Sequence, residues 1–158
     1  TFIKLSNSLD IPLSNLSHGP DSQKDIFFND TKLLPLICFE SIFPNLLKSN
    51  IENEIIINIS NDGWFGNSLA PYQHLQITQV RALEFNRYIL RAANTGLSAV
   101  INNHGEVIEY IPINKHGKLS GFVPINLDRS FYSRYGDISV LMLLFLTLLS
   151  KGLIRKNK

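Results

Sequence analysis

Cysteine and charge are both scarce in this sequence. Its 158 residues contain a single cysteine, Cys38, which excludes an internal disulfide framework and a metal site built from several cysteines. The net charge is only +2 and the basic residues form no continuous stripe before the last eight positions, so nucleic acid is not an expected partner. Four scattered histidines without paired acids give no reason to expect a metal or another cofactor. Hydrophobic residues make up 44% and charged residues 18%, which is typical of a folded domain.

The sequence also lacks an initial methionine and any charged leader followed by an apolar run. We therefore expect its start to lie inside a longer protein. A long apolar run occurs only near the end, where residues 138–149 read ISVLMLLFLTLL. Runs of about 10–14 apolar residues are more often buried core helices than membrane spans. This run, however, is Leu-rich on every face and precedes four basic residues without an acid, the positive-inside pattern. We predict a transmembrane helix with a basic cytoplasmic tail at 137–158, after a globular domain at 1–136.

The rest of the chain alternates between strand and helix signals. Residues 1–31 read as loop with short extended pieces, because Ser, Asn, Asp and Pro are frequent there. Two apolar segments predict strands, 33–39 and the β-branched 54–60. Helices are expected at 44–50 and 72–86, and further strands at 88–93, 98–102, 107–111 and 119–124. This order predicts an α/β layered domain with a mixed sheet.

Cys38 lies at the end of the first apolar strand, just before a turn and a helix. That position suits a nucleophile, because the thiol lies at the rim of the sheet and following N–H groups face whatever the sulfur attacks. Free cysteines are also among the most buried and inert residues. Position alone leaves both interpretations open.

Four sequence words around Cys38 occur in a specific order. They are CFESIFP from Cys38, SNDGWFG from Ser60, PYQHLQ from Pro71 and RALEFNRYILRAANTG from Arg81. This succession resembles the nitrilase, or carbon–nitrogen hydrolase, superfamily, and within it the apolipoprotein N-acyltransferases. The resemblance extends from about Asp10 through the terminal apolar segment. It implies the carboxyl-terminal part of a nitrilase-like αββα sandwich, followed by the membrane helix.

The resemblance also implies a reaction and its partners. Such enzymes transfer a fatty acyl group from a phospholipid donor to the N-terminal cysteine α-amine of a lipoprotein acceptor, through a cysteine thioester. The globular part then faces the periplasm at the bacterial inner membrane, with the C-terminus in the cytoplasm. No cofactor is involved.

Individual residues receive roles from the same resemblance. Cys38 corresponds to the nucleophile and Glu40 to a supporting acid, although Glu40 is equally consistent with an acid favoured at a helix N-terminus. Phe39, Trp64 and Phe65 are expected to line the substrate site, with core packing as the alternative for the aromatics. Outside these positions, Asn61 and Asp62 read as turn formers and His74 as a surface or capping residue. Two arginines, Arg81 and Arg91, are expected to form ion pairs inside the domain, and Glu84 with Arg87 a local helical pair.

Two activating residues of the nitrilase triad, a glutamate and a lysine, are missing at the expected places. No glutamate precedes Glu40, and Lys4 is followed by Leu-Ser-Asn instead of the His-Leu of the acyltransferases. We therefore expect this chain to be incomplete as a catalyst, with its partner residues on a missing amino-terminal half. Two alternatives remain, a soluble nitrilase-type amidase and a non-catalytic membrane-anchored remnant.

Overall fold

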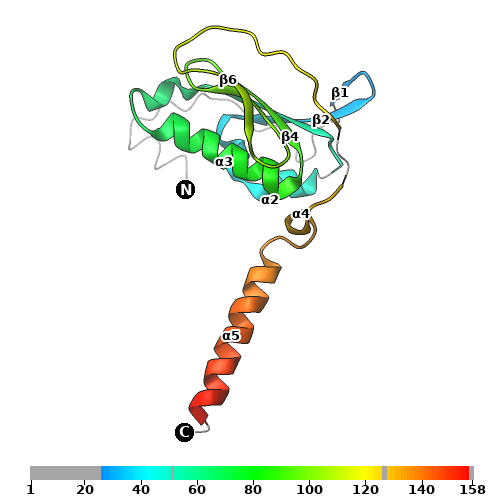
Figure 1. Ribbon diagram of the computed structural model, residues 1–158, viewed down its shortest axis with the longest axis vertical. Coiled ribbons are helices and arrows are strands. Elements are labelled where there is room, and N and C mark those ends of the chain that lie inside the picture. The colour runs from blue at the N-terminus through cyan, green and yellow to red at the C-terminus, as the bar shows by residue number, and fades with distance from the viewer. Residues whose placement is uncertain (1–25, 51, 126–127, 157–158) are drawn as a thin grey trace, which may run out of the picture.

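The computed structural model describes residues 26–50, 52–125 and 128–156, and Figure 1 shows their arrangement. A six-stranded mixed sheet forms the centre, in the order β1-β2-β3-β4-β5-β6. Strands β2 (Thr31–Ile37), β3 (Ile55–Ser60) and β4 (Tyr88–Ala93) are parallel neighbours. The outer strands β1 (Ile26–Phe28), β5 (Ser98–Ile101) and β6 (Val107–Ile111) pair antiparallel. The α/β class with a mixed sheet is thus confirmed.

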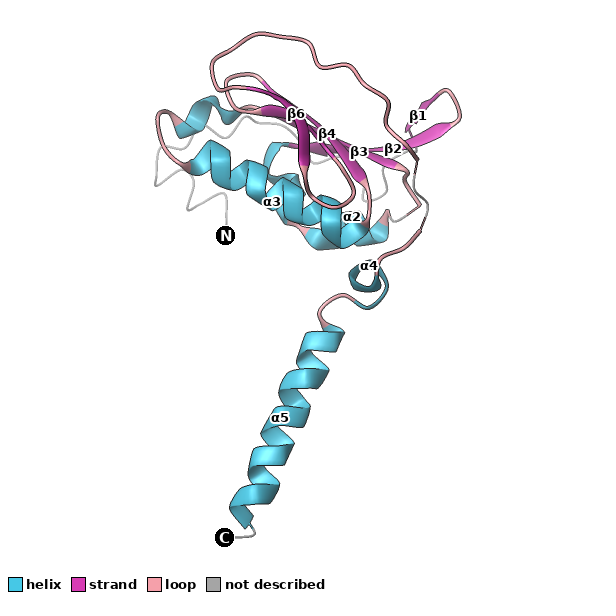
Figure 2. Ribbon diagram, in the orientation of Figure 1, coloured by secondary structure: helices cyan, strands magenta, loops and turns pink. Residues whose placement is uncertain are grey.

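Two helices cover one face of the sheet. Helix α2 (Pro44–Ser49) links β2 to β3, and α3 (Ala70–Phe85) links β3 to β4. Figure 2 shows both on the same side of the strands. The core between these layers is aliphatic, with one aromatic ring. It contains Leu34, Leu36, Ile56, Ile89, Ala99 and Ile101 from the strands, Leu47 from α2, and Leu75, Ala82 and Phe85 from α3.

Helix α3 has clear start and stop signals. Pro71 occupies its first turn, where a missing N–H costs nothing. Asn86 follows its last residue in the left-handed conformation and donates its backbone N–H to carbonyls of the last turn. The helix therefore begins two residues before the predicted 72–86 segment and ends one residue earlier.

Some expected elements differ from the structure. The segment 119–124 is not a strand but part of an irregular connection, in which Phe122 is 90% exposed. The connection contains two glycines, Gly117 and Gly121, and two prolines, Pro112 and Pro124, which favour an irregular path. Residues 26–28, expected as loop with short extended pieces, form a hairpin with β2 around a left-handed Asn29. The short helix α4 (Phe131–Tyr135) was not predicted, although Ser130 caps it by accepting from the Ser133 N–H.

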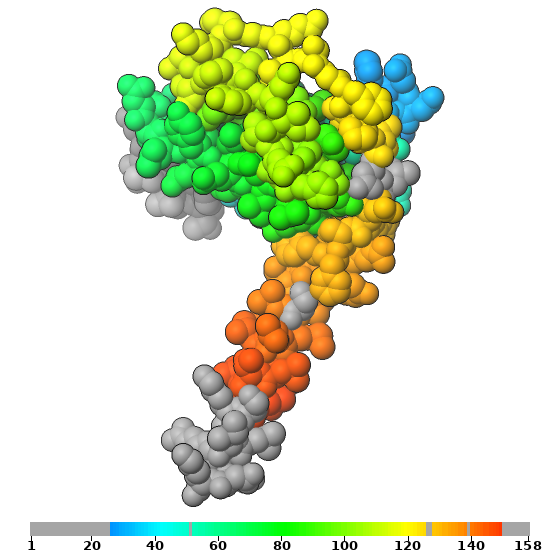
Figure 3. All heavy atoms as spheres, in the orientation of Figure 1, coloured from blue at the N-terminus to red at the C-terminus, as the bar shows by residue number. Residues whose placement is uncertain are grey.

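The terminal apolar segment forms helix α5 (Ile138–Lys156), which projects away from the globular part in Figure 3. Its described apolar side chains from 138 to 149 are largely exposed. The predicted membrane span is not supported, because no helix in the described ranges is long and apolar enough to cross a membrane.

Candidate active site

Cys38 lies at the carboxyl edge of the parallel strands. It follows β2 and opens the 3-10 turn η1 (Cys38–Ile42), while η2 (Asp62–Phe65) follows β3 at the same edge. Ligand sites of α/β sheets form at such edges, because the parallel strands end there together. The sequence placed Cys38 and Phe39 in the strand, but the strand ends at Ile37.

The Cys38 backbone adopts an uncommon conformation. Its φ is 50°, in the left-handed region. Residues other than glycine rarely adopt this conformation, because it costs them roughly 1–2 kcal/mol. The turn presents a free, half-buried thiol at the end of the strand. A strained residue of this kind persists only when surrounding groups fix it.

Glu40 closes the Cys38 turn locally. One of its carboxylate oxygens accepts the Ile37 backbone N–H at 2.7 Å. This bond ties the last residue of β2 to the third residue of η1, on either side of Cys38. The geometry gives Glu40 a role in shaping the cysteine turn.

A buried polar cluster lies behind the thiol. The Ser60 hydroxyl is 3.4 Å from Cys38 Sγ and donates to Asp62 Oδ1 at 2.5 Å. Asp62 Oδ2 pairs with Arg91 Nη2 at 2.8 Å, with both side chains inaccessible to solvent. Arg91 also donates through Nη1 to Asn58 Oδ1 in a short contact. The β3–β4 register brings these two side chains together, since Asn58 and Arg91 are paired residues on one face.

Asp62 is therefore more than a turn former. It is 2% exposed, and its carboxylate fills space beside Gly96, where an added Cβ would lie 2.0 Å from Oδ2. Burial acts to raise the pKa of Asp62, but the Ser60 hydrogen bond and the Arg91 charge outweigh it and hold the pKa below the usual 3.8. The carboxylate is thus ionised at neutral pH.

His74 was expected at the surface or at a cap, and this was wrong. It is 3% exposed on the inner face of α3. Its Nδ1 lies 3.1 Å from Arg91 Nη2 and 3.3 Å from Asp62 Oδ1, and its Nε2 lies 3.2 Å from the Cys38 carbonyl oxygen. Burial and the Arg91 charge lower the pKa of His74 below its usual 6.5, against the opposing effect of Asp62. The imidazole is therefore neutral at pH 7.

Two of the three aromatic residues expected at the substrate site, Phe39 and Phe65, lie next to His74. The rings of Phe39 and Phe65 each lie 6.0 Å from the His74 ring, measured between centroids. Phe39 is half exposed and also contacts Phe43 edge to face. Trp64 is 72% exposed on η2, so its expected role at the substrate site rests on the resemblance alone.

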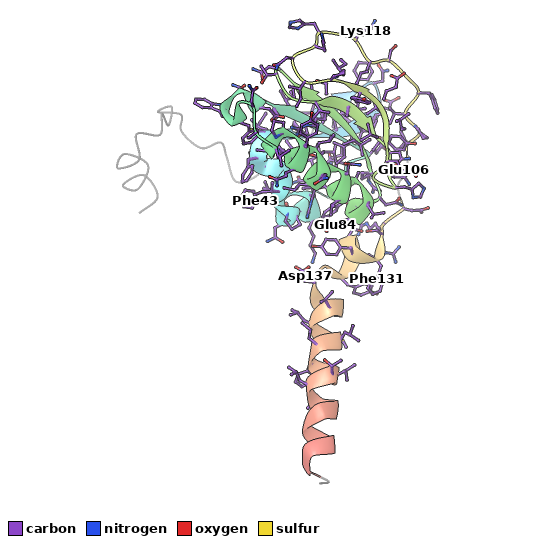
Figure 4. All side chains as sticks on the ribbon, turned by 60° about the vertical axis from the view of Figure 1, so that its left-hand side comes forward. Phe43, Glu84, Glu106, Lys118, Phe131 and Asp137 are labelled. Carbon is purple, nitrogen blue, oxygen red and sulfur yellow. The ribbon has the colours of Figure 1, made fainter. Side chains whose placement is uncertain are left out.

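The arginine pairs are partly as expected. Arg91 pairs with Asp62, and Arg81 pairs with Glu84 at 2.6 Å. Arg87 is buried and donates to the carbonyls of Asn53 and Asp128, which ties the domain edge to the segment before α4. Burial raises the pKa of Glu84, and this effect outweighs the Arg81 charge, which lowers it. Figure 4 shows Glu84 near Asp137 at the junction with α5.

Within the described ranges, no lysine or glutamate side chain hydrogen-bonds to Cys38. Its thiol lies 3.4 Å from the Ser60 hydroxyl, and its backbone carbonyl oxygen contacts Asn58, Ser41 and His74. Lys4 lies outside the described residues. The same part of the chain holds no group of three or more metal-ligating side chains.

The fold of the chain and its cysteine turn at the edge of the parallel strands indicate its protein class. The chain belongs to the carbon–nitrogen hydrolase family, whose model matches residues 13–121. Solved structures share the fold: a Saccharomyces cerevisiae protein of branch 10 of the nitrilase superfamily has a TM-score of 0.55 at 19% identity, over 64% of this chain and 40% of its own. A Helicobacter pylori carbon-nitrogen hydrolase gives 0.53 at 15% identity, over 61% and 41%.

Within that class the chain is similar to apolipoprotein N-acyltransferases, which confirms the resemblance of the sequence words. It is 37% identical to the Nitrosomonas europaea enzyme over 146 residues, covering 92% of this chain and 29% of the relative. The Rickettsia bellii enzyme is 38% identical over 128 residues, covering 80% and 26%. The Pasteurella multocida enzyme is 32% identical over 158 residues, covering 97% and 30%. The chain thus spans less than a third of these relatives.

Proposed function

We propose that this chain is the nucleophile-bearing part of an apolipoprotein N-acyltransferase. It accepts a fatty acyl group from a phospholipid on Cys38 and passes it to the α-amine of a lipoprotein's N-terminal cysteine. The observation that carries the proposal is the strained Cys38 turn at the carboxyl edge of β2, φ 50° with a half-buried thiol, in a chain similar to these enzymes. Strain maintained at one reactive side chain is characteristic of functional sites.

The proposed chemistry has two balanced steps. The Cys38 thiol gives its proton to the general base and attacks the phospholipid ester carbonyl as a thiolate, the C–O bond breaks, and the leaving lysophospholipid alkoxide takes that proton from the base. The lipoprotein amine then attacks the thioester carbonyl, the C–S bond breaks, and the proton of the amine passes through the base to the Cys38 sulfur as the amide forms. A thioester divides one difficult transfer into two easier ones. The backbone N–H of Phe39 would stabilise the oxyanion, a task that does not depend on its side chain.

The side chains near the thiol support a lipid substrate. Phe39 and Phe43, in mutual ring contact, are each 52% exposed beside the cysteine turn. The resemblance adds Trp64, which is 72% exposed on η2. Exposed aromatic rings together form a surface suited to an acyl chain. We propose that they contact the donor lipid, and that Glu40 maintains the turn during transfer.

We further propose that the base and the oxyanion lysine come from polypeptide outside the described residues. The contacts of Cys38 include neither group, whereas the resemblance places both before the cysteine in sequence. No glutamate precedes Glu40 in this sequence, so the chain by itself should show no acyl transfer. Rapid formation of a Cys38 thioester with phospholipid by this chain alone would contradict this part of the proposal.

A chimera tests the function directly. The 146-residue segment of the Nitrosomonas europaea enzyme that matches this chain would be replaced by the matching residues of this chain. With an alkyne-labelled phosphatidylethanolamine and a diacylglyceryl-cysteine peptide, the chimera should label Cys38 through a hydroxylamine-sensitive bond and acylate the peptide. Cys38→Ala in the same chimera should abolish both signals.

The parent relative is the positive control, and equal resistance to limited proteolysis shows that the chimera folds. A folded chimera that leaves Cys38 unlabelled would overturn the proposal. Ammonia release from small amides without acyl transfer would instead indicate a nitrilase-type amidase. Absence of both activities would indicate a non-catalytic remnant.

A further inference from the structure

The backbone carbonyl of Cys38 is held by three side chains from three elements. Asn58 Nδ2 of β3 lies 3.2 Å from this oxygen, Ser41 Oγ of η1 lies 3.3 Å away, and His74 Nε2 of α3 lies 3.2 Å away. All three side chains are buried. A carbonyl surrounded in this way cannot rotate without losing several buried hydrogen bonds, so it fixes the left-handed turn that carries the thiol.

The donors Asn58 and His74 share a further neighbour, Arg91. A guanidinium can only donate. Its Nη1 meets the side-chain oxygen of Asn58, which leaves the amide nitrogen of Asn58 facing the Cys38 carbonyl. Two groups face His74 Nδ1: Arg91 Nη2 at 3.1 Å and, farther away, Asp62 Oδ1 at 3.3 Å. Accepting the closer bond, from Arg91, requires Nδ1 to be unprotonated. The single proton of the neutral imidazole then lies on Nε2, which also faces the Cys38 carbonyl.

The guanidinium is itself held in place. Asp62 Oδ2 accepts from Nη2 at 2.8 Å, and the Leu97 carbonyl accepts from Nε at 3.2 Å. Arg91 is 3% exposed, so its guanidinium cannot exchange these hydrogen bonds for hydrogen bonds with solvent. One cation thereby orients two separate donors toward the same oxygen.

We propose that Arg91, His74 and Asn58 are positioning residues for the nucleophile: Arg91 fixes the tautomer of His74 and the amide orientation of Asn58, so that both donate to the Cys38 carbonyl. The inference depends on the proposed function only in taking Cys38 as the nucleophile. Its test uses the spectroscopy of the carbonyl itself and needs no acyl transfer, so the two proposals can fail separately.

The single cysteine makes the measurement specific, because the full chain grown with [1-¹³C]cysteine gives one enriched carbonyl signal. Hydrogen bonds to a carbonyl deshield its carbon. In His74→Gln the amide nitrogen can take the place of Nε2, whereas in His74→Asn it reaches only as far as Nδ1. We expect the signal to move upfield in His74→Asn and to stay at the wild-type position in His74→Gln. The exposed His104→Gln serves as a control and should leave the signal unchanged.

The tautomer provides a second measurement. In the ¹⁵N-labelled chain at pH 7.5, the ring-nitrogen signals of His74 are identified as those that disappear in His74→Gln. Their chemical shifts should show a protonated Nε2 and an unprotonated Nδ1. A protonated Nδ1, or an imidazolium, would overturn the proposal. So would equal carbonyl shifts in His74→Asn and His74→Gln, since a residue that only fills space would not distinguish the two amides. Thermal unfolding of each variant confirms that a folded chain is measured.

Discussion

Gly96 shows at the scale of one residue how closely the buried charges are packed. Its backbone lies against the Asp62 carboxylate, so that an added Cβ would come within 2.7 Å of three Asp62 atoms. Asp62 cannot move away, because Ser60 and Arg91 hold both of its oxygens. The NTG segment after β4 therefore ends in glycine for lack of space.

Replacing this glycine should disrupt the ion pair. We expect Gly96→Ala to lower the free energy of unfolding by about 3 kcal/mol, the sum of overpacking and a displaced buried charge. Urea unfolding followed by circular dichroism measures the loss. The matched control is Gly121→Ala, where an added Cβ meets nothing within 4 Å and the change should stay within about 0.5 kcal/mol. Equal stability of the two variants would show that Asp62 has room to relax.

At the scale of elements, α2 covers the sheet beside the cysteine turn. Its two adjacent leucines differ sharply: Leu47 is 1% exposed in the core, and Leu46 is 40% exposed. Helix α2 directly follows η1, so its packing also anchors the far end of the Cys38 turn.

The two leucines provide a matched pair of substitutions. Leu47→Ala should destabilise the fold by roughly 3 kcal/mol through lost burial and a residual cavity. Leu46→Ala should cost less than about 1 kcal/mol, since much of its side chain already contacts water. Thermal and urea unfolding of both variants give the comparison, and similar losses would mean that α2 does not pack as described.

Helix α5 presents a different surface from the other elements. Its described apolar side chains, including Leu143 and Leu146, are between 48% and 69% exposed. Such a surface is suited to lipid, which fits the proposed phospholipid substrate and the expected membrane partner. We propose membrane contact for this helix on that ground.

Vesicle flotation tests this contact. The chain should float with vesicles of phosphatidylethanolamine and phosphatidylglycerol. Leu143→Asp combined with Leu146→Asp should reduce the floated fraction roughly tenfold or more, since an aspartate in an apolar helix costs about 3 kcal/mol on insertion scales. Leu83→Asp changes an exposed leucine on α3 and should float like the wild type. Unchanged flotation of the double variant would exclude α5 as the contact.

For the whole molecule, the buried charges determine how stability depends on pH. The folded pKa of His74 lies below its unfolded value near 6.5, so the folded state binds fewer protons than the unfolded state. Its contribution is complete above about pH 6.5 and is lost as the pH falls through the lowered folded pKa. The Asp62 contribution, with a pKa lowered from 3.8, is lost only below that value.

The pKa of the unfolded histidine, near 6.5, lies between pH 7.5 and 5.5. Across this window His74 should lower the wild-type free energy of unfolding with a slope of at most about 1.4 kcal/mol per pH unit. His74→Gln should show a smaller fall, and subtraction removes groups common to both proteins, including Glu84 with its raised pKa. Urea unfolding at both pH values makes the comparison. Parallel curves would mean that His74 titrates normally.

The sequence determined the local elements and the place of Cys38 at the end of a strand. Apolar runs and turn residues predicted β4 and β6 to the residue, and α2, α3, β3 and β5 within two residues at either end. These signals act over a few residues, through propensity and periodicity, and are therefore readable along the chain. The position of Cys38 at a strand end and the similarity of the surrounding words followed in the same way.

Only the tertiary structure decided what Asp62, His74 and Arg91 do. An aspartate in an Asn-Asp-Gly segment and a histidine early in a helix have the local signature of surface residues. Their burial arises because β3, α3 and β4 converge at one edge, which brings together groups 12 and 29 positions apart in sequence. Contacts over such separations depend on how strands and helices pack, and local sequence patterns do not encode that packing.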